Sequence, residues 1–144
     1  MTIFSSDDDI ERIGRGLLDR TLPKPDWTHA AHFAAALWLL RHRPGLVAQG
    51  QVGAIIRAYN VATGGVNDDQ GGYHETITVA SMRAAAGFLR RYPGETPLWR
   101  IADDLVASPL GQPGWLLDYW SRPRLFSVAA RWDWLAPDLR PFPW

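Results

Sequence analysis

Residues 27–43 read WTHAAHFAAALWLLRHR, and this stretch decides the fold class. It is dense in alanine and leucine, which are strong helix formers. Pro44 and Gly45 follow directly and disfavour continuation of a helix. The sequence therefore predicts a helix over 27–43, and we expect Asp26 to cap its N-terminus.

Apolar residues recur at helical spacing along most of the remaining chain. Ile10, Ile13 and Leu17, for example, follow one stripe of a helix. Glycine and proline bound the other segments that show this pattern. Helices are predicted over 7–18, 51–62, 73–91 and 97–107, with shorter helical pieces over 113–120 and 127–134.

The last part of the chain is rich in tryptophan and proline. Because Pro137, Pro141 and Pro143 interrupt regular structure, we expect an irregular C-terminal segment that wraps over the helices. The length is typical of one domain, which we place at residues 1–144. The sequence thus predicts an all-α fold, a single compact bundle of about five to six helices.

Charge and composition exclude several classes of function. Fifteen Lys and Arg side chains balance fifteen Asp and Glu side chains, so no net charge attracts nucleic acid or an anionic membrane. The chain has no cysteine, so a metal site would need nitrogen and oxygen ligands. No apolar run approaches about 18 residues, and the N-terminus lacks the pattern of a signal peptide. We expect a cytoplasmic protein with no nucleic-acid or membrane partner.

Three of the four histidines lie in two short motifs at predicted helix starts. Residues 27–32 read WTHAAH, and residues 73–76 read YHET. On a helix, His29 and His32 lie about 60° apart on one face, near enough to share a metal ion or a substrate. The helix macrodipole disfavours imidazolium in a first turn, and neutral imidazole is the form that binds metals.

Helical angles predict where the residues of the second motif point. If the helix has begun by His74, Thr76 and Arg83 share a stripe that we expect to face solvent. His74 then lies opposite Arg83 and points inward. Glu75 lies on a flank, so His74 and Glu75 do not both point the same way.

The first functional hypothesis is a small metal-dependent enzyme or metalloprotein. His29, His32 and His74 would bind one divalent ion and leave positions open for water and substrate. Glu75 or Tyr73 would act as a catalytic proton carrier or support the ligands. Imidazole suits zinc, iron and nickel alike, so these residues do not select the ion.

Other interpretations stay open at this point. A single buried histidine is more often a core residue with satisfied hydrogen bonds, and Glu75 has an ordinary role as a first-turn anion. The eight tryptophans supply core area, or they wall a metal-free pocket for a small aromatic or amphipathic ligand. A third hypothesis is an interaction module, such as a homodimer that uses the aromatic C-terminal third.

Residues 63–72 read TGGVNDDQGG and are predicted to form a loop. The segment lacks the lysine and the preceding strand of a phosphate-binding loop. It leads directly into Tyr73 and His74. It is therefore either a lid over the histidines or a flexible surface connection, and the second is the more common role of such loops.

The chain contains five short motifs, each of which occurs once. They are WTHAAH at 27–32, Tyr59-Asn60 with the glycine-rich loop, YHETIT at 73–78, YWSRPRLFS at 119–127 and ARWDWLAPDL at 130–139. In this combination the chain resembles a family of small, all-helical bacterial proteins of unknown function, over about Asp26 to Pro141. The resemblance implies a helical fold and draws attention to the two histidine motifs. It supplies neither a reaction nor a substrate.

Overall fold

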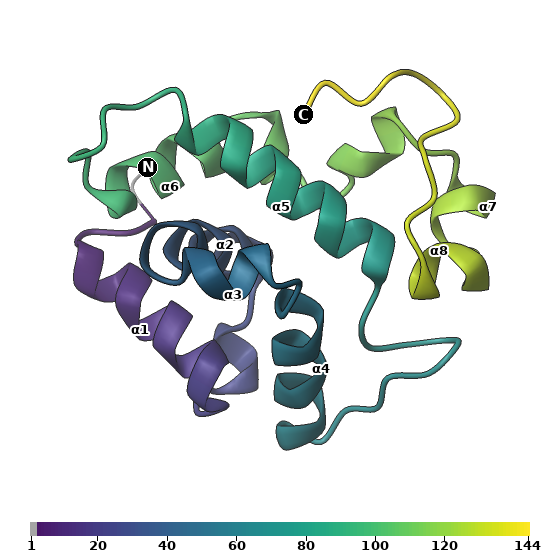
Figure 1. Cartoon of the computed structure of the whole chain (residues 1–144), viewed down its shortest axis with the longest axis horizontal. Coiled ribbons are helices and arrows are strands. Elements are labelled where there is room, and N and C mark those ends of the chain that lie inside the picture. The colour runs from purple at the N-terminus through teal and green to yellow at the C-terminus, as the bar shows by residue number, and fades with distance from the viewer. Residues whose placement is uncertain (1–2) are drawn as a thin grey trace.

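The computed structural model describes residues 3–144, so residues 1 and 2 of the predicted domain lie outside the described part. No strand occurs among the described residues, which confirms the all-α fold (Figure 1). Short 3₁₀ helices cover Lys24–Asp26, Pro109–Gly111 and Trp115–Asp118. The α-helices are α1 Asp7–Asp19, α2 His29–His42, α3 Pro44–Ala48, α4 Val52–Ala62, α5 Glu75–Leu89, α6 Leu98–Ala107, α7 Arg122–Leu125 and α8 Val128–Trp132.

Helix α2 is the centre of the fold. It contacts α1, α5 and α6, and every residue from Phe33 to Leu39 is buried. A helix that is apolar all round must be covered on all sides, and the alanines of α2 let its neighbours approach closely. The alanines and large apolar residues of α2 therefore form the centre of the core.

Helices α1 and α2 meet at a glycine. Gly14 lies directly against the ring of Trp38, so closely that a Cβ atom at this position would overlap the indole. Trp38 is itself 1% exposed, and the guanidinium of Arg43 lies 4.8 Å from its ring centroid. The absence of a side chain at Gly14 thus allows α1 to lie against the largest residue of α2.

The ends of α2 differ from the prediction. The residue that caps α2 is Thr28, whose hydroxyl accepts a hydrogen bond from the Ala31 amide at 3.2 Å. Asp26 belongs instead to a 3₁₀ turn and pairs with Arg12 on the surface. The prediction for Asp26 was wrong because Trp27 and Thr28 are not helical. Pro44 does end α2, but it also begins α3, since proline fits the first turn of a new helix.

The C-terminal segment packs back onto the bundle, and residues 133–144 contain no helix. Trp120 is fully buried there and donates its indole N–H to the Leu135 carbonyl at 2.9 Å. Phe142 contributes a second anchor, with its ring centroid 5.2 Å from that of Trp120. Figure 1 shows this tail returning from the α7–α8 end of the molecule across to α5. Aromatic contacts therefore hold an irregular chain in place.

Thr76 corrects the prediction of a solvent-facing stripe on α5. Its side chain is fully buried, whereas Arg83 is exposed as expected. The Thr76 hydroxyl donates to the Asp133 carbonyl at 2.8 Å and accepts from the Leu135 amide at 3.1 Å. The stripe is covered at its N-terminal end because the C-terminal tail lies across it.

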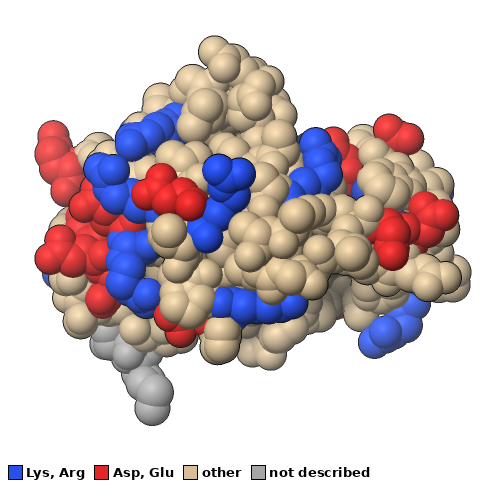
Figure 2. Space-filling model, turned by 90° about the horizontal axis from the view of Figure 1, so that it is seen from below, with Lys and Arg blue, Asp and Glu red and all other residues tan. Residues whose placement is uncertain are grey.

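The surface carries charges of both signs. On the face that Figure 2 displays, acidic and basic side chains intermingle at one end, and further side chains of both signs lie at the other end. None of the helices described for residues 3–144 combines the length and apolarity needed to cross a bilayer.

Candidate ligand-binding site

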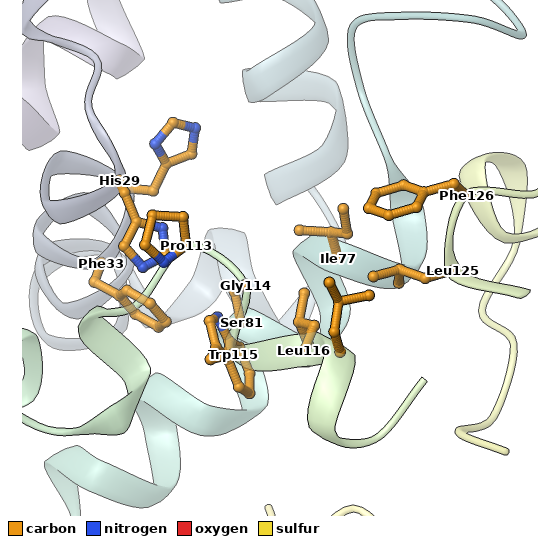
Figure 3. A pocket seen from close by; sticks show the side chains of 12 residues that line it. His29, Phe33, Ile77, Ser81, Pro113, Gly114, Trp115, Leu116, Leu125 and Phe126 are labelled. Carbon is orange, nitrogen blue, oxygen red and sulfur yellow. The ribbon is translucent and has the colours of Figure 1, made fainter. Parts of the chain in front are cut away.

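A cavity of about 300 Å³ lies between α2, α5 and the segments that flank α7. Figure 3 shows His29, Phe33 and Trp115 on one side of it and Ile77, Leu125 and Phe126 on the other. Its size is at the lower end of the range for small-molecule sites. The lining consists of His29, His32 and Phe33 from α2, Ile77 and Ser81 from α5, and Pro113, Gly114, Trp115, Leu116, Leu117, Leu125 and Phe126 from the C-terminal part.

The imidazole of His29 is oriented by a backbone carbonyl. Its Nε2 atom lies 2.9 Å from the Leu110 oxygen, which can only accept a hydrogen bond. Nε2 therefore carries the proton, and in the neutral ring Nδ1 is a free acceptor. The ring also packs edge-on against Phe33, with centroids 5.4 Å apart at 89°. Two contacts thus fix both the tautomer and the plane of His29.

His32 has the opposite tautomer for the same physical reason. Its Nδ1 atom donates to the Thr28 carbonyl at 2.6 Å, so Nε2 is the free acceptor. The ring stacks on Trp27 with centroids 3.9 Å apart. The residue keeps an exposed edge, yet desolvation by the surrounding protein lowers the pKa of His32 below its usual 6.5. The neutral, proton-accepting form is therefore favoured.

The wall of the cavity is otherwise apolar. The hydroxyl of Ser81 and the indole N–H of Trp115 are the other polar side-chain groups on it, and no lysine, arginine, aspartate or glutamate of residues 3–144 lines the cavity. A second, smaller cavity of about 70 Å³ adjoins the first and shares His32, Ile77 and Ser81 with it. No charged side chain of the cavity lining therefore competes with the two imidazoles for hydrogen bonds to a ligand.

His74 lies outside this cavity, at the start of α5. It is the N-cap residue, and its Nδ1 accepts a hydrogen bond from the Ile77 amide at 3.2 Å. Its Nε2 donates to the Leu125 carbonyl at 2.7 Å. Burial, with the nearby charge of Arg131, lowers the pKa of His74. His74 is buried, but it precedes the helix on which the angle prediction was based, and both of its nitrogens are already engaged.

Tyr73 and Glu75 line a separate cavity of about 200 Å³ on the other side of α5. The Tyr73 hydroxyl donates to the Glu75 carboxylate at 2.5 Å, and the Arg57 guanidinium lies 4.8 Å from the tyrosine ring centroid. Burial, followed by the hydrogen bond to Glu75, raises the pKa of Tyr73. Neither residue lines the cavity of His29 and His32, so an acid-base role for this pair would operate at its own cavity.

The predicted metal ligands are therefore divided in space. His29 and His32 line one cavity, and His74 forms a clamp between α5 and Leu125. Within residues 3–144, no three side chains of His, Asp or Glu are grouped so as to hold one ion. An ion at the first two imidazoles would need its other ligands from water or substrate.

The glycine-rich loop is more ordered by hydrogen bonds than its composition indicated. The Asn67 side chain accepts from Asn60 and from the Tyr73 amide, each at 2.9 Å, and donates to the Arg57 carbonyl. Gly72 has φ +81°, a conformation that glycine adopts without strain. No residue of 63–72 lines the cavity of His29 and His32.

Most of the cavity wall was not identified from the sequence. Ile77 and Ser81 are four residues apart and therefore share one face of α5, a signal that sequence alone does offer. The sequence marks Phe126 as apolar but does not indicate that it lines a cavity. Its side chain is 55% exposed. Val128 and Trp132 are also exposed nearby, in the third of the chain where a dimer contact was predicted.

Comparisons with protein-family models, with curated proteins and with solved structures yield no match. The geometry of the site therefore carries the functional argument.

Proposed function

We propose that the chain binds a small organic molecule in the cavity lined by His29 and His32. The observation that carries this proposal is the pair of imidazoles in an otherwise apolar cavity, each held in one tautomer by a backbone carbonyl. Apolar walls with a few oriented polar groups are typical of small-molecule sites. This corresponds to the metal-free pocket that the tryptophan and histidine content favoured as an alternative.

The walls supply the affinity and the histidines supply the orientation. Phe33, Trp115 and Leu116 are buried and come from two different parts of the chain, so they form a preformed apolar surface. Burial of apolar ligand surface contributes about 25 cal/mol per Å². A ligand that also hydrogen-bonds to an imidazole is fixed in one pose.

Dye binding tests the proposal. N-phenyl-1-naphthylamine is uncharged and emits strongly in apolar sites, so we expect saturable emission on titration into the protein. Ser81→Leu fills the cavity and should abolish the saturable signal. The matched control is Ala54→Leu, which adds the same side chain to an exposed position of α4 outside the cavity. Equal binding by both variants, with both folded, would refute the proposal.

A divalent metal is the second candidate, and one observation favours it. Imidazoles that bind a metal commonly donate their other N–H to a backbone carbonyl or carboxylate, as His29 and His32 both do. These two residues, with water or substrate, would hold zinc, iron or nickel. His74 would not take part, because ligation would break one of its two hydrogen bonds.

Elemental analysis of protein purified without chelator tests the metal proposal. The expected result is near-stoichiometric metal that is lost in His29→Ala and in His32→Ala and is retained in His42→Ala. His42 is an exposed residue at the end of α2 and is the matched control. Metal content that is the same in all four proteins would contradict it.

A further inference from the structure

We infer that the ligand is an uncharged molecule with an apolar body and a hydroxyl group that donates a hydrogen bond to His29 or His32. This inference rests on the proposed small-molecule site and specifies the chemistry of its ligand. It follows from the tautomers of the two histidines and from the absence of ionised side chains on the wall.

The two imidazoles offer acceptors. Nε2 of His29 and Nδ1 of His32 donate to carbonyls of Leu110 and Thr28, so the remaining nitrogen of each neutral ring carries only a lone pair. A group that meets such a nitrogen must donate a hydrogen bond. Alcohols and phenols have an O–H group that donates. Ethers and ketones have only acceptor oxygens, which form no hydrogen bond with an imidazole lone pair.

A charged ligand does not fit this cavity. A carboxylate would face the two imidazole acceptors and no arginine or lysine, and only the neutral donors of Ser81 and Trp115 would be left to meet its charge. An ammonium group would find acceptors but no carboxylate to offset the hydration that it loses on entering the cavity. A hydroxyl group has a much smaller desolvation cost, and its hydrogen bond to an imidazole offsets that cost.

The ligand body is defined by the opposite side of the cavity. Ile77, Leu116 and Leu125 present aliphatic side chains there. None of them requires a polar partner from the ligand. A molecule with one polar end therefore matches the cavity better than one that is polar along its length.

A matched series of four probes tests the inference by displacement of N-phenyl-1-naphthylamine. The probes are 1-octanol, heptyl methyl ether, octanoate and octylammonium, which are similar in size. We expect 1-octanol to bind about fivefold more tightly than the ether, the factor expected for one net hydrogen bond. The ions should bind at least about tenfold more weakly than 1-octanol.

Variants locate the acceptor. His29→Phe and His32→Phe keep a ring of similar size and remove the lone pair, so at least one of them should abolish the preference for the alcohol while retaining affinity for the ether. His42→Phe, at the exposed end of α2, should retain the preference. If a variant fails to fold, the ratio of alcohol to ether affinity in the unsubstituted protein still tests the donor inference.

The outcomes separate this inference from the proposal on which it rests. Saturable dye binding with equal affinity for 1-octanol and the ether, or tighter binding of either ion, overturns the donor inference and leaves the small-molecule site intact. Absence of dye binding and of any probe binding overturns both. Preference for the alcohol that survives in both phenylalanine variants also overturns the assignment to His29 and His32.

Discussion

Replacing His74 should destabilise the protein through two separable hydrogen bonds. His74→Ala removes the acceptor that caps α5, which costs about 1 kcal/mol. It also leaves the Leu125 carbonyl without its partner at 2.7 Å, which costs about 1–3 kcal/mol for a buried group. His74→Asn keeps a capping side chain and loses only the second contact. We therefore expect losses of about 2–4 kcal/mol for alanine and about 1–3 kcal/mol for asparagine.

Urea unfolding followed by circular dichroism measures these losses. The matched control is His42→Ala, because His42 is exposed at the end of α2 and should cost less than about 0.5 kcal/mol. If His74→Ala were as stable as the control, His74 would not be the clamp described here. A loss for asparagine equal to that for alanine would show that the cap contributes nothing.

The same clamp has a defined pH dependence. Burial lowers the pKa of His74 in the folded protein below the usual 6.5. Above about pH 6.5 the histidine is neutral in both the folded and the unfolded protein. Just below that pH only the unfolded protein binds a proton at His74. The free energy of unfolding therefore falls as the pH decreases from about 6.5 towards the lower folded pKa. His74→Asn lacks this loss, so its cost should be smaller at about pH 5.5 than at about pH 7.5. A cost that is independent of pH would refute the assignment.

Three further substitutions test local packing by the same unfolding measurement. Gly72→Ala places a Cβ on a residue with φ +81°, where it would also overlap the Val66 backbone carbonyl, and should cost at least about 1–2 kcal/mol; an unchanged stability would contradict the described geometry of this loop. Gly14→Ala drives a methyl group into Trp38 and should cost about 1–3 kcal/mol, whereas Gly45→Ala, which meets nothing within 4 Å, should cost nothing. Thr76→Val removes two part-buried hydrogen bonds to the Asp133 carbonyl and the Leu135 amide and should cost about 1–2 kcal/mol; a neutral result would mean that the tail readjusts.

The helices could be predicted because their causes are local. Alanine and leucine density located α2, and periodic apolar residues located α1, α4 and α6, with ends that differ from the prediction by two residues or fewer. The start of α2 was misplaced because aspartate and threonine both cap helices and aspartate is the more favoured of the two, whereas Thr28 is the cap in the structure. Asp26 belongs to a 3₁₀ turn at Lys24–Asp26, and the sequence pattern did not predict this turn.

Features that depend on distant contacts could not be predicted. Thr76 shares a stripe with exposed Arg83, and its burial comes from Asp133, 57 positions later in the chain. His74 was placed inside α5 because histidine is not among the residues that commonly cap helices. The helix begins at Glu75, two residues after its predicted start, and His74 is its N-cap and donates to the Leu125 carbonyl.

The clamp and the cavity are connected through one residue. Leu125 accepts the hydrogen bond of His74 with its carbonyl and lines the cavity with its side chain. The adjacent residue, Phe126, lines the same wall. His74 therefore fixes the position of this wall without contacting a ligand, in contrast to His29 and His32.

This connection separates a positioning role from a general effect on stability. His74→Asn should weaken binding of N-phenyl-1-naphthylamine because the wall at Leu125 loses its anchor. Gly14→Ala should lower stability by a similar amount and leave dye affinity unchanged, since α1 does not line the cavity. Both titrations are made well below the unfolding midpoint, so that the folded protein is measured. If the two variants lower dye affinity equally, affinity follows overall stability, and the link through Leu125 is refuted.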